Sequence, residues 1–474
     1  MPDLATTLPR PTDGGTTYTF RLRPGIRYSN GTLVRASDVR RGLRRQLSFG
    51  ANPAGFYDGI LGAQTCWQHR GRCDLSAGIV TNDAAGTVTF HLTRADPDFL
   101  YKLSEPLAAP APPGAPDHPI HRAPFMPGTG PYMISQYQPK RSMTLVRNPY
   151  FRQWSYAAQP AGYPEVIRFE QMTDPGKQQA AVIAGRADLV DIAENGQPYH
   201  PLAVRYPARL HPGIKTATDF VFLNTRQPPF TNIKARQAVN YAIDRARIMA
   251  LLHLDPSEAA PTCQILPADF PGYKPYCPYT TGPKNGAWHG PDMAKARRLA
   301  QESGTTNVPV TMWTSNDRMG KALGSYLVQL LKDLGYQAKL HAVSSDRYTA
   351  VFNSRNKIQV GVSGWLADFP AASDFFLPVL TCHSFYDDPT NTNNQAGFCD
   401  PQVDKLASQA QAAQVTDPAY ARRLWAQVDR IVTSQAPWAP VYDESYSAGF
   451  VSARVGNYQD SPFYGPLVDQ MWVR

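Results

Sequence analysis

Apolar residues recur at helical spacing in several parts of the chain, and these stretches predict its clearest elements. Residues 232–249 keep a 3.6-residue apolar period, which predicts one helix with Arg236 and Arg245 on its solvent-facing side. The same period over residues 319–334 predicts a second helix that Gly335 ends. Shorter periodic stretches predict further helices over residues 175–183, 403–413 and 419–434.

Alternating apolar and polar residues predict strands between these helices. Strands over residues 308–313 and 337–343 flank the helix at 319–334, which predicts a βαβ unit. Residues 13–22 and 83–92 each join an Asp/Gly turn to an alternating strand, so two similar strands bracket the first segment. The alternation of helices and strands predicts an α/β protein with mixed sheets in at least two lobes.

A short basic helix is expected between the two bracketing strands. Ser37 is expected to cap it, with Leu43 and Leu47 facing inward. The arginines of the sequence RRGLRR at residues 40–45, Arg40, Arg41, Arg44 and Arg45, then face outward. An acidic ligand could bind there, but a solvated helix face is the simpler interpretation.

Length and charge limit the class of protein. A chain of 474 residues with 42% hydrophobic content can bury two or three cores. The formal net charge of +9 is scattered outside residues 40–45, so no clustered stripe predicts a nucleic-acid site. The sequence has no run of 18 or more apolar residues, so it predicts no membrane span. Its first residues lack the pattern of a secretory signal.

The six cysteines fall into three local pairs. Each pair lies within a stretch rich in Pro, Gly, Asn or Asp, which favours local disulfides over the other connectivities. Metal binding is the competing interpretation, but no CxxC couple supplies ligand spacing. Disulfides indicate an oxidising compartment, in conflict with the missing signal. The predicted pairs are Cys66 with Cys73, Cys263 with Cys277, and Cys382 with Cys399.

The stretch GVSGWLADFPAASDFF at residues 361–376 carries the strongest candidate chemistry. A strand ends there and is followed by an indole (Trp365), a carboxylate (Asp368) and a turn stiffened by Pro370. An acid beside an aromatic wall suits a small cation such as an amine. The alternative from spacing alone is that Asp368 caps a helix over residues 371–377 and Trp365 is ordinary core.

Catalytic motifs are absent from the sequence. GxSxG, HExxH and Walker patterns do not occur, and His118 with His121 would make only a weak metal site. The acidic pair Asp443 and Glu444 is expected to be solvated. We therefore predict a protein that is not an enzyme and has no cofactor or bound metal.

Several segments together resemble the peptide, dipeptide and nickel-binding proteins of ABC importers, solute-binding protein family 5. They occur in the order typical of that family and cover most of the chain. The segments are YTFRLRPGIRYSNGTLVRASDV (18–39), GTGPYMISQY with LVRNPYF (128–151), AVIAGRADLVD (181–191), FLNTRQPPFTNIKARQAVNYAIDR (222–245) and GWLADFP (364–370).

The resemblance implies a fold and a domain organisation. The fold would be a bilobal periplasmic-binding-protein-like α/β fold of type II, with mixed sheets, a two-segment hinge and the extra domain of the larger members. Residues 1–118 would be the extra domain, 119–224 with 440–474 the first lobe, and 225–439 the second lobe. The hinge crossings would lie near Asn224 and Pro437.

The resemblance also implies a ligand site. In peptide-binding members of the family, the Asp of the GWxxD segment binds the free amino group of the peptide. That position is Asp368 here, beside Trp365, Gly364 and Leu366. The pocket aromatics would be Phe220 and, near Phe56, Tyr57, while Arg355 would replace a basic residue that some members carry at the position of Val362.

The implied function is capture of a small peptide in an interlobe cleft and delivery to ABC permease subunits. The protein would be a monomer outside the cytoplasm, at the cell surface or in the periplasm, and tethered to the membrane in its full-length form. Family members carry a longer segment before the YTFRL strand, so this chain would be a trimmed form, a misread start or part of a fusion protein. A ligand-sensing domain of a longer regulatory protein is the alternative.

Overall fold

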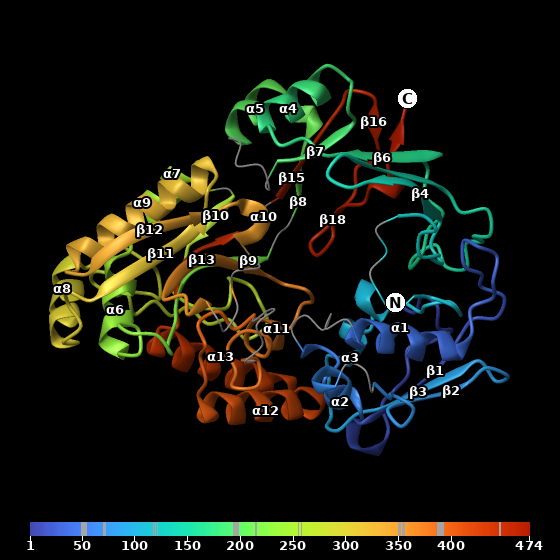
Figure 1. Cartoon of the computed structure of the whole chain (residues 1–474), viewed down its shortest axis with the longest axis horizontal. Coiled ribbons are helices and arrows are strands. Elements are labelled where there is room, and N and C mark those ends of the chain that lie inside the picture. The colour runs from blue at the N-terminus through green and yellow to red at the C-terminus, as the bar shows by residue number, and fades with distance from the viewer. Residues whose placement is uncertain are drawn as a thin grey trace. The chain divides into compact units, whose positions relative to one another are not determined.

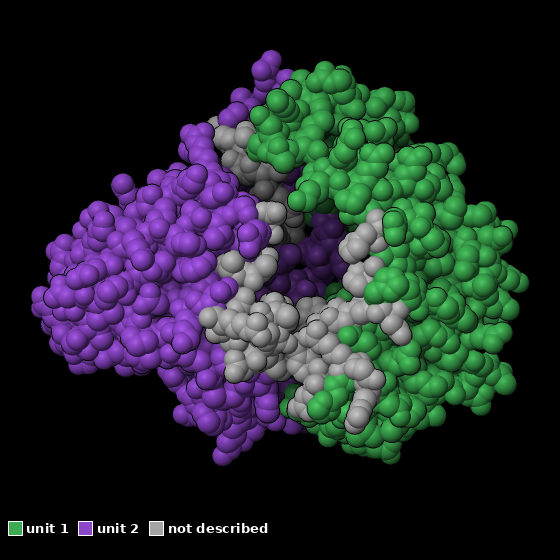
Figure 2. All heavy atoms as spheres, viewed as in Figure 1, with its two compact units in different colours: residues 1–190, 451–460, 466–474 green, residues 191–450, 461–465 purple. Residues whose placement is uncertain are grey.

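The chain folds into two compact units, which Figure 2 colours separately. Unit 1 is Met1–Val190, Val451–Asp460 and Pro466–Arg474, and unit 2 is Asp191–Phe450 and Ser461–Gly465. The structure is a computed structural model. It describes residues 1–48, 55–69, 73–116, 118, 120, 122–192, 199–213, 216–254, 256, 258–348, 352, 356–385, 393–444 and 447–474.

Unit 1 is built from small antiparallel sheets and short helices (Figure 1). Its three-stranded sheets have the orders β1-β3-β2 and β4-β5-β6. The helices are α1 (Ala36–Ser48), α2 (Ala63–Gln68), α3 (Phe99–Lys102) and α4 (Pro175–Ile183). The strands are β1 (Thr17–Arg21), β2 (Ile79–Asn82), β3 (Thr87–His91), β4 (Tyr132–Gln138), β5 (Ser142–Arg147), β6 (Val166–Glu170), β16 (Val455–Gly456) and β19 (Trp472–Val473).

Unit 2 contains the largest sheet, with the strand order β10-β14-β9-β13-β11-β12. Its strands are β8 (Leu210–Gly213), β9 (Ala217–Leu223), β10 (Ala259–Pro261), β11 (Pro309–Ser315), β12 (Gln337–Val343), β13 (Val360–Leu366) and β14 (Trp438–Glu444). Its helices are α5 (Tyr199–Arg205), α6 (Ile233–Ala242), α7 (Arg245–Leu251), α8 (Met293–Glu302), α9 (Arg318–Asp333), α10 (Ser345–Tyr348), α11 (Ser373–Phe376), α12 (Pro401–Thr416) and α13 (Pro418–Gln435). The chain passes between the units at β7 (Leu189–Asp191), β15 (Ser447–Val451), β17 (Asp460–Ser461) and β18 (Gly465–Pro466).

Both faces of the six-stranded sheet are covered by apolar cores. Along β9, Val221 and Leu223 belong to one cluster with α6 to α9, while Phe220 and Phe222 belong to another with α11 to α13. This follows from the two-residue period of a strand, which sends successive side chains to opposite faces. β11 pairs with β12 in parallel and β13 pairs with β9 antiparallel, so the predicted mixed sheet is confirmed.

The periodic helices are confirmed, with one correction. The stretch 232–249 forms two helices, because Ile243 is extended and Asp244 caps a new helix by accepting from the Arg247 N–H. This break turns Arg245 inward, where its Nε donates to the carbonyls of Thr262 and Pro440 and its side chain is fully buried. The prediction that Arg245 and Arg236 face solvent is therefore wrong.

The two bracketing strands are β1 and β3, which pair antiparallel with each other. The basic helix between them is α1, with Leu43 and Leu47 buried as predicted. Ser37 does not cap it, because the helix starts at Ala36 and the Ser37 side chain donates to Asp83.

All three predicted disulfides are confirmed. They join Cys66 to Cys73, Cys263 to Cys277 and Cys382 to Cys399. No helix among the described residues is both long and apolar enough to span a membrane.

The predicted domain organisation stays a prediction. It places residues 191–224 in the first lobe, whereas the contacts place Asp191–Phe450 in unit 2. The physical reason for the second grouping is that β9 pairs along its length with β13 and β14.

Candidate functional site

The GWLAD segment lies where β13 leaves the sheet of unit 2. β13 is held between β9 and β11, and Gly364, Trp365 and Leu366 pair with Asp219, Thr218 and Ala217 of β9. The N–H of Ala367 still donates to the Thr216 carbonyl, 2.9 Å away. β11 pairs only with Val360 and Gly361, so it is the pairing with β9 that fixes the backbone up to the residue before Asp368.

Gly364 is required by a close neighbour. A Cβ at this position would lie 2.8 Å from Oδ1 of Asp219, because residues directly opposite in an antiparallel pair share a face. The absence of a side chain lets the Asp219 carboxylate lie over the strand. Asp219 also contacts Tyr442 of β14, whose pKa is raised well above 10.0 by burial and by the charges of Asp219 and Glu444.

Trp365 and Leu366 occupy opposite faces of β13. Trp365 packs against the cluster that contains α11 to α13, so part of its role is that of ordinary core. Its Nε1 is buried without a hydrogen-bond partner among the described residues, a property shared by Trp425 and Trp438. Leu366 is 41% exposed, which leaves an apolar surface beside the acid.

Asp368 is mostly buried and is joined to a second acid. Its N–H donates to Oδ2 of Asp374, 2.8 Å away, and the two side chains are also hydrogen-bonded. Asp374 lies in α11 and is fully buried. The N-cap of α11 is Ala372, which makes no side-chain cap hydrogen bond, so the structure does not support the capping alternative for Asp368.

Burial changes the acidity of this site. It raises the pKa of Asp368 from 3.8 to about 6, and the hydrogen bond with Asp374 partly opposes that change. A carboxylate that is partly removed from water gains most from a partner of opposite charge. Asp368 is therefore suited to hold one cation, such as an ammonium group.

The structure brings together four of the seven predicted ligand residues. Gly364, Trp365, Leu366 and Asp368 form one continuous segment, whereas Phe220 is 2% exposed and stacks on Trp438 with ring centroids 3.5 Å apart. Its position is that of a core residue.

The other two predicted ligand residues, Tyr57 and Arg355, are not found beside Asp368 in the described structure. Tyr57 belongs to unit 1, where it is fully buried and donates its hydroxyl to the Lys102 carbonyl. Arg355 lies outside the described residues.

Sequence reasoning missed the acids around this segment. Asp443 was expected to be solvated, but it lies in β14 at 7% exposure and accepts hydrogen bonds from Thr218 Oγ1 and the Ala268 N–H. Burial raises its pKa well above 3.8. A single Asp inside the apolar strand TDFVFL was the available signal for Asp219, but no local pattern marked Asp374.

No group of three or more His, Cys, Asp or Glu side chains in the described ranges has the arrangement of a metal site. The acids at this end of the sheet are separated onto different faces and loops. They suit hydrogen bonding and capture of an organic cation better than coordination of a metal.

Comparison with known proteins places this geometry in a family context. The profile described as "Bacterial extracellular solute-binding proteins, family 5 Middle" matches residues 1–387. The glutathione-binding protein GsiB of Escherichia coli (strain K12) is 26% identical over 449 residues, covering 91% of this chain and 78% of GsiB.

Solved structures show the same fold. The Haemophilus influenzae OppA complex with the peptide RPPGFSPFR has a TM-score of 0.80 at 20% identity, covering 100% of this chain and 90% of that one. Helicobacter pylori DppA in complex with the peptide STSA has a TM-score of 0.77 at 18% identity, covering 100% and 89%. The fold is therefore that of the large periplasmic binding proteins, as the sequence predicted.

Proposed function

Because this chain belongs to the bacterial extracellular solute-binding proteins of family 5, we propose that it binds a small peptide by its free amino group. The carrying observation is the mostly buried carboxyl of Asp368, held at the end of β13 and joined to the buried Asp374. Membership in a family of binding proteins confirms the prediction that the chain is not an enzyme.

The geometry supports an ammonium ligand in two ways. A carboxylate removed from water gains most from a partner that brings the opposite charge and N–H donors. The partly exposed Leu366 lies beside it in sequence and would present apolar surface to the first residue of a peptide, while Trp365 packs on the opposite face of β13. Exposed backbone groups of β13 would supply hydrogen bonds that do not depend on side chains.

Transport is the role that fits such a binding protein. We propose that two lobes close over the peptide and that the loaded protein delivers it to ABC permease subunits. GsiB, OppA and DppA are named as binding proteins for glutathione or were solved with peptides, which supports a peptide as the ligand class. We further propose that the protein acts as a monomer, tethered to the membrane in its full-length form. Nothing in the comparisons favours a sensing domain of a regulatory protein.

Replacement of one acid tests this function. Asp368→Asn keeps the size of the side chain and removes its charge, so affinity for alanine peptides of two to five residues should fall about 100-fold, or about 2.7 kcal/mol, by calorimetric titration. Asp333→Asn is the matched control, because Asp333 is exposed at the end of α9. Equal affinity of Asp368→Asn and the control would contradict the proposed role of Asp368.

A further inference from the structure

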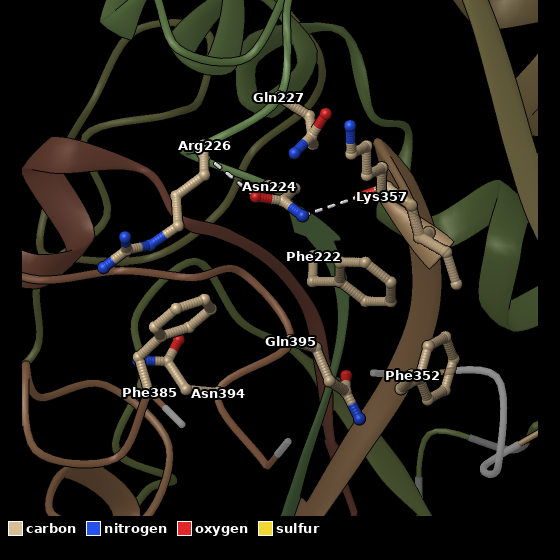
Figure 3. A pocket seen from close by; sticks show the side chains of 10 residues that line it. Phe222, Asn224, Arg226, Gln227, Phe352, Lys357, Phe385, Asn394 and Gln395 are labelled. Carbon is tan, nitrogen blue, oxygen red and sulfur yellow. Dashed lines mark hydrogen bonds between the residues drawn. The ribbon is translucent and has the colours of Figure 1, made fainter. Parts of the chain in front are cut away.

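A pocket lies at the opposite end of β9 and β13 from Asp368 (Figure 3). The strands run antiparallel, with Leu366 opposite Ala217 at the acidic end and Val360 opposite Leu223 at the other. At about 3.3 Å per residue, the two ends are about 20 Å apart. The pocket offers about 40 Å³ to the centres of water-sized molecules and is open to solvent, so it suits a small molecule rather than a peptide.

Arg226 is fixed on one side of this pocket. Its Nε donates to the Gly397 carbonyl at 2.8 Å, and its guanidinium carbon lies 3.8 Å above the centre of the Phe385 ring. Gly397 permits this approach, because a Cβ there would lie 2.8 Å from Cδ of Arg226. A guanidinium held in this way has lost much of its conformational freedom before any ligand arrives.

The terminal nitrogens of Arg226 remain available. Among the described residues, neither makes a hydrogen bond or an ion pair, so the outer edge of the guanidinium can accept a two-oxygen anion. Backbone contacts hold the base of the side chain, since the Arg226 N–H donates to Oδ1 of Asn224.

A second cation, Lys357, lines the other side of the pocket (Figure 3). It is exposed and makes no ion pair with any residue that the structure describes. Its backbone has a φ of +48°, a left-handed conformation that lysine rarely adopts and that costs about 1 kcal/mol or more. None of the ten described lining residues is acidic, and two of them, Arg226 and Lys357, are basic.

The remaining walls are phenyl rings and carboxamides. Phe222 and Phe352 pack edge to face, with centroids 5.2 Å apart, and both are buried. The Oε1 of Gln395 is buried and accepts no hydrogen bond from the described part of the chain. A carboxamide can exchange its oxygen and nitrogen by rotation, so Gln395 can also offer an N–H to an anion.

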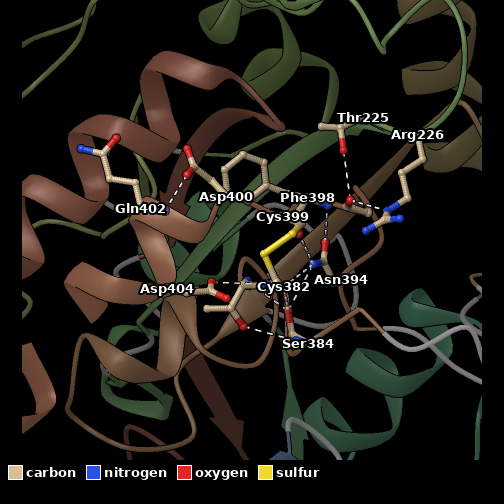
Figure 4. The surroundings of a disulfide bond; sticks show 12 residues. Thr225, Arg226, Cys382, Ser384, Asn394, Phe398, Cys399, Asp400, Gln402 and Asp404 are labelled. Atoms are coloured by element: carbon tan, nitrogen blue, oxygen red, sulfur yellow. Dashed lines mark hydrogen bonds between the residues drawn. A yellow bond between two sulfur atoms is a disulfide. The ribbon is translucent and has the colours of Figure 1, made fainter. Parts of the chain in front are cut away.

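The Cys382–Cys399 disulfide lies next to this pocket (Figure 4). The chain between the two cysteines carries Phe385, Asn394, Gln395 and Gly397. Thr225, which follows β9, donates its N–H and its Oγ1 to the Ala396 carbonyl, at 2.7 and 3.0 Å. Asn394 braces the same turn through its hydrogen bonds with Ser384 and Phe398. The disulfide therefore closes the loop that holds the Arg226 side chain.

We propose that this pocket binds a small organic carboxylate, independently of the peptide site at Asp368. The carboxylate would bind the guanidinium of Arg226, Lys357 would supply the second charge, and the apolar part of the ligand would face the phenyl rings.

Benzoate and its neutral analogue benzamide test the proposal without any change to the protein. Titration of the full chain, followed by saturation-transfer NMR and calorimetry, should show benzoate binding at least about tenfold tighter than benzamide. Equal affinities would overturn the proposal, and so would inorganic phosphate binding more tightly than benzoate, because the site would then be one for an inorganic anion.

Variants locate the site. Arg226→Gln should weaken benzoate about tenfold or more, with a smaller loss for Arg226→Lys, which keeps the charge without the planar fork. Arg423→Gln is the control, because Arg423 is an exposed arginine stacked on Tyr420 away from the pocket. Asp368→Asn should leave benzoate affinity unchanged. An unchanged affinity in Arg226→Gln, or an equal loss in Arg423→Gln or Asp368→Asn, would overturn the assignment.

Discussion

The two ends of the β9–β13 pair carry opposite charge on one backbone framework. At one end Asp219, Asp368 and Asp374 surround the last residues of β13, and burial raises the pKa of Asp368 to about 6. At the other end Arg226 and Lys357 line a pocket with no acid among its described lining residues. The strands themselves are apolar in both places, since Phe222 and Val360 are as buried as Phe220.

The difference shows that the sheet supplies position, while the charges come from residues beyond its strands and, at the acidic end, also from Asp219 within β9. Antiparallel pairing from Val360 to Leu366 fixes both ends at once. A ligand at either end therefore meets groups held by the same rigid element, which lowers the conformational entropy lost on binding. The charge of each end can then be removed separately, and doing so tests the comparison.

Removal of the Cys382–Cys399 disulfide should have the largest effect and should affect one end only. With 17 residues of separation, Cys382→Ser with Cys399→Ser should lower the free energy of unfolding by about 3 kcal/mol in the chain-entropy model. Benzoate affinity should fall, because the loop that holds Arg226 is no longer closed, while peptide affinity should persist. Calorimetry and titration below the melting temperature measure both.

The matched control is Cys66→Ser with Cys73→Ser in unit 1. It removes a disulfide that closes a shorter loop, with a loop-closure entropy of similar size. It should lose comparable stability and keep benzoate binding. Loss of benzoate binding in both double variants would show that the effect is one of stability rather than of the local loop.

The pH dependence of binding should differ between the two ends. A peptide needs the ionised form of Asp368, whose pKa in the free protein is about 6, so affinity should fall about tenfold per pH unit below that value. Between pH 6 and pH 4 the loss would approach 100-fold. Benzoate should bind equally from pH 5.5 to 7.5, because arginine, lysine and the carboxylate keep their charge. Titrations across this range measure both slopes.

The raised pKa of Asp368 also affects the stability of the fold, which should fall as pH rises, whereas peptide affinity should increase. Because burial raises the pKa of Asp368 above its unfolded value of 3.8, the folded protein keeps a proton there between about pH 4 and pH 6 that the unfolded chain releases. The contribution of Asp368 to stability therefore decreases as pH rises through this window. Melting curves of Asp368→Asn should lack that part of the slope, and parallel curves for both proteins would contradict the shift.

Two glycines of β13 provide the smallest and most local test. A Cβ at Gly361 would lie 2.7 Å from the buried ring of Phe222, whereas a Cβ at Gly364 would meet the Asp219 carboxylate. Gly361→Ala should cost about 2 kcal/mol, because a packed ring cannot move aside. Gly364→Ala should cost about 1 kcal/mol, and Asp219→Ala should relieve most of it. Melting temperatures of Gly361→Ala, Gly364→Ala and Gly364→Ala with Asp219→Ala show whether an added methyl group costs less stability at the acidic end of β13.

The sequence predicted those parts of the fold that depend on local pattern. The helix α9 with its flanking parallel strands follows from a 3.6-residue stripe ended by Gly335, and the three disulfides follow from cysteines close in the chain. The family resemblance pointed to Asp368, whose local spacing alone suggested a helix cap.

What the sequence did not reveal depends on distant partners. Arg245 is buried because carbonyls of Thr262 and Pro440 accept from it, and Pro440 is 195 residues away. Asp443 is buried beside Thr218, 225 residues distant. A charged residue on a helix or near a chain end is normally solvated, so only the folded contacts could show these exceptions. The anion-binding pocket is of the same kind, since Arg226 is positioned by Phe385 and Gly397.

The most direct test of the central claim compares one peptide in two forms. Calorimetric titration of the wild-type protein at pH 7 with trialanine and with N-acetyl-trialanine isolates the amino group, because the two ligands differ in charge at that end alone. The account predicts that acetylation removes most of the affinity and that Asp368→Asn no longer distinguishes the two. Equal affinity of both forms for the wild-type protein would contradict the claim that Asp368 binds the amino end of a peptide.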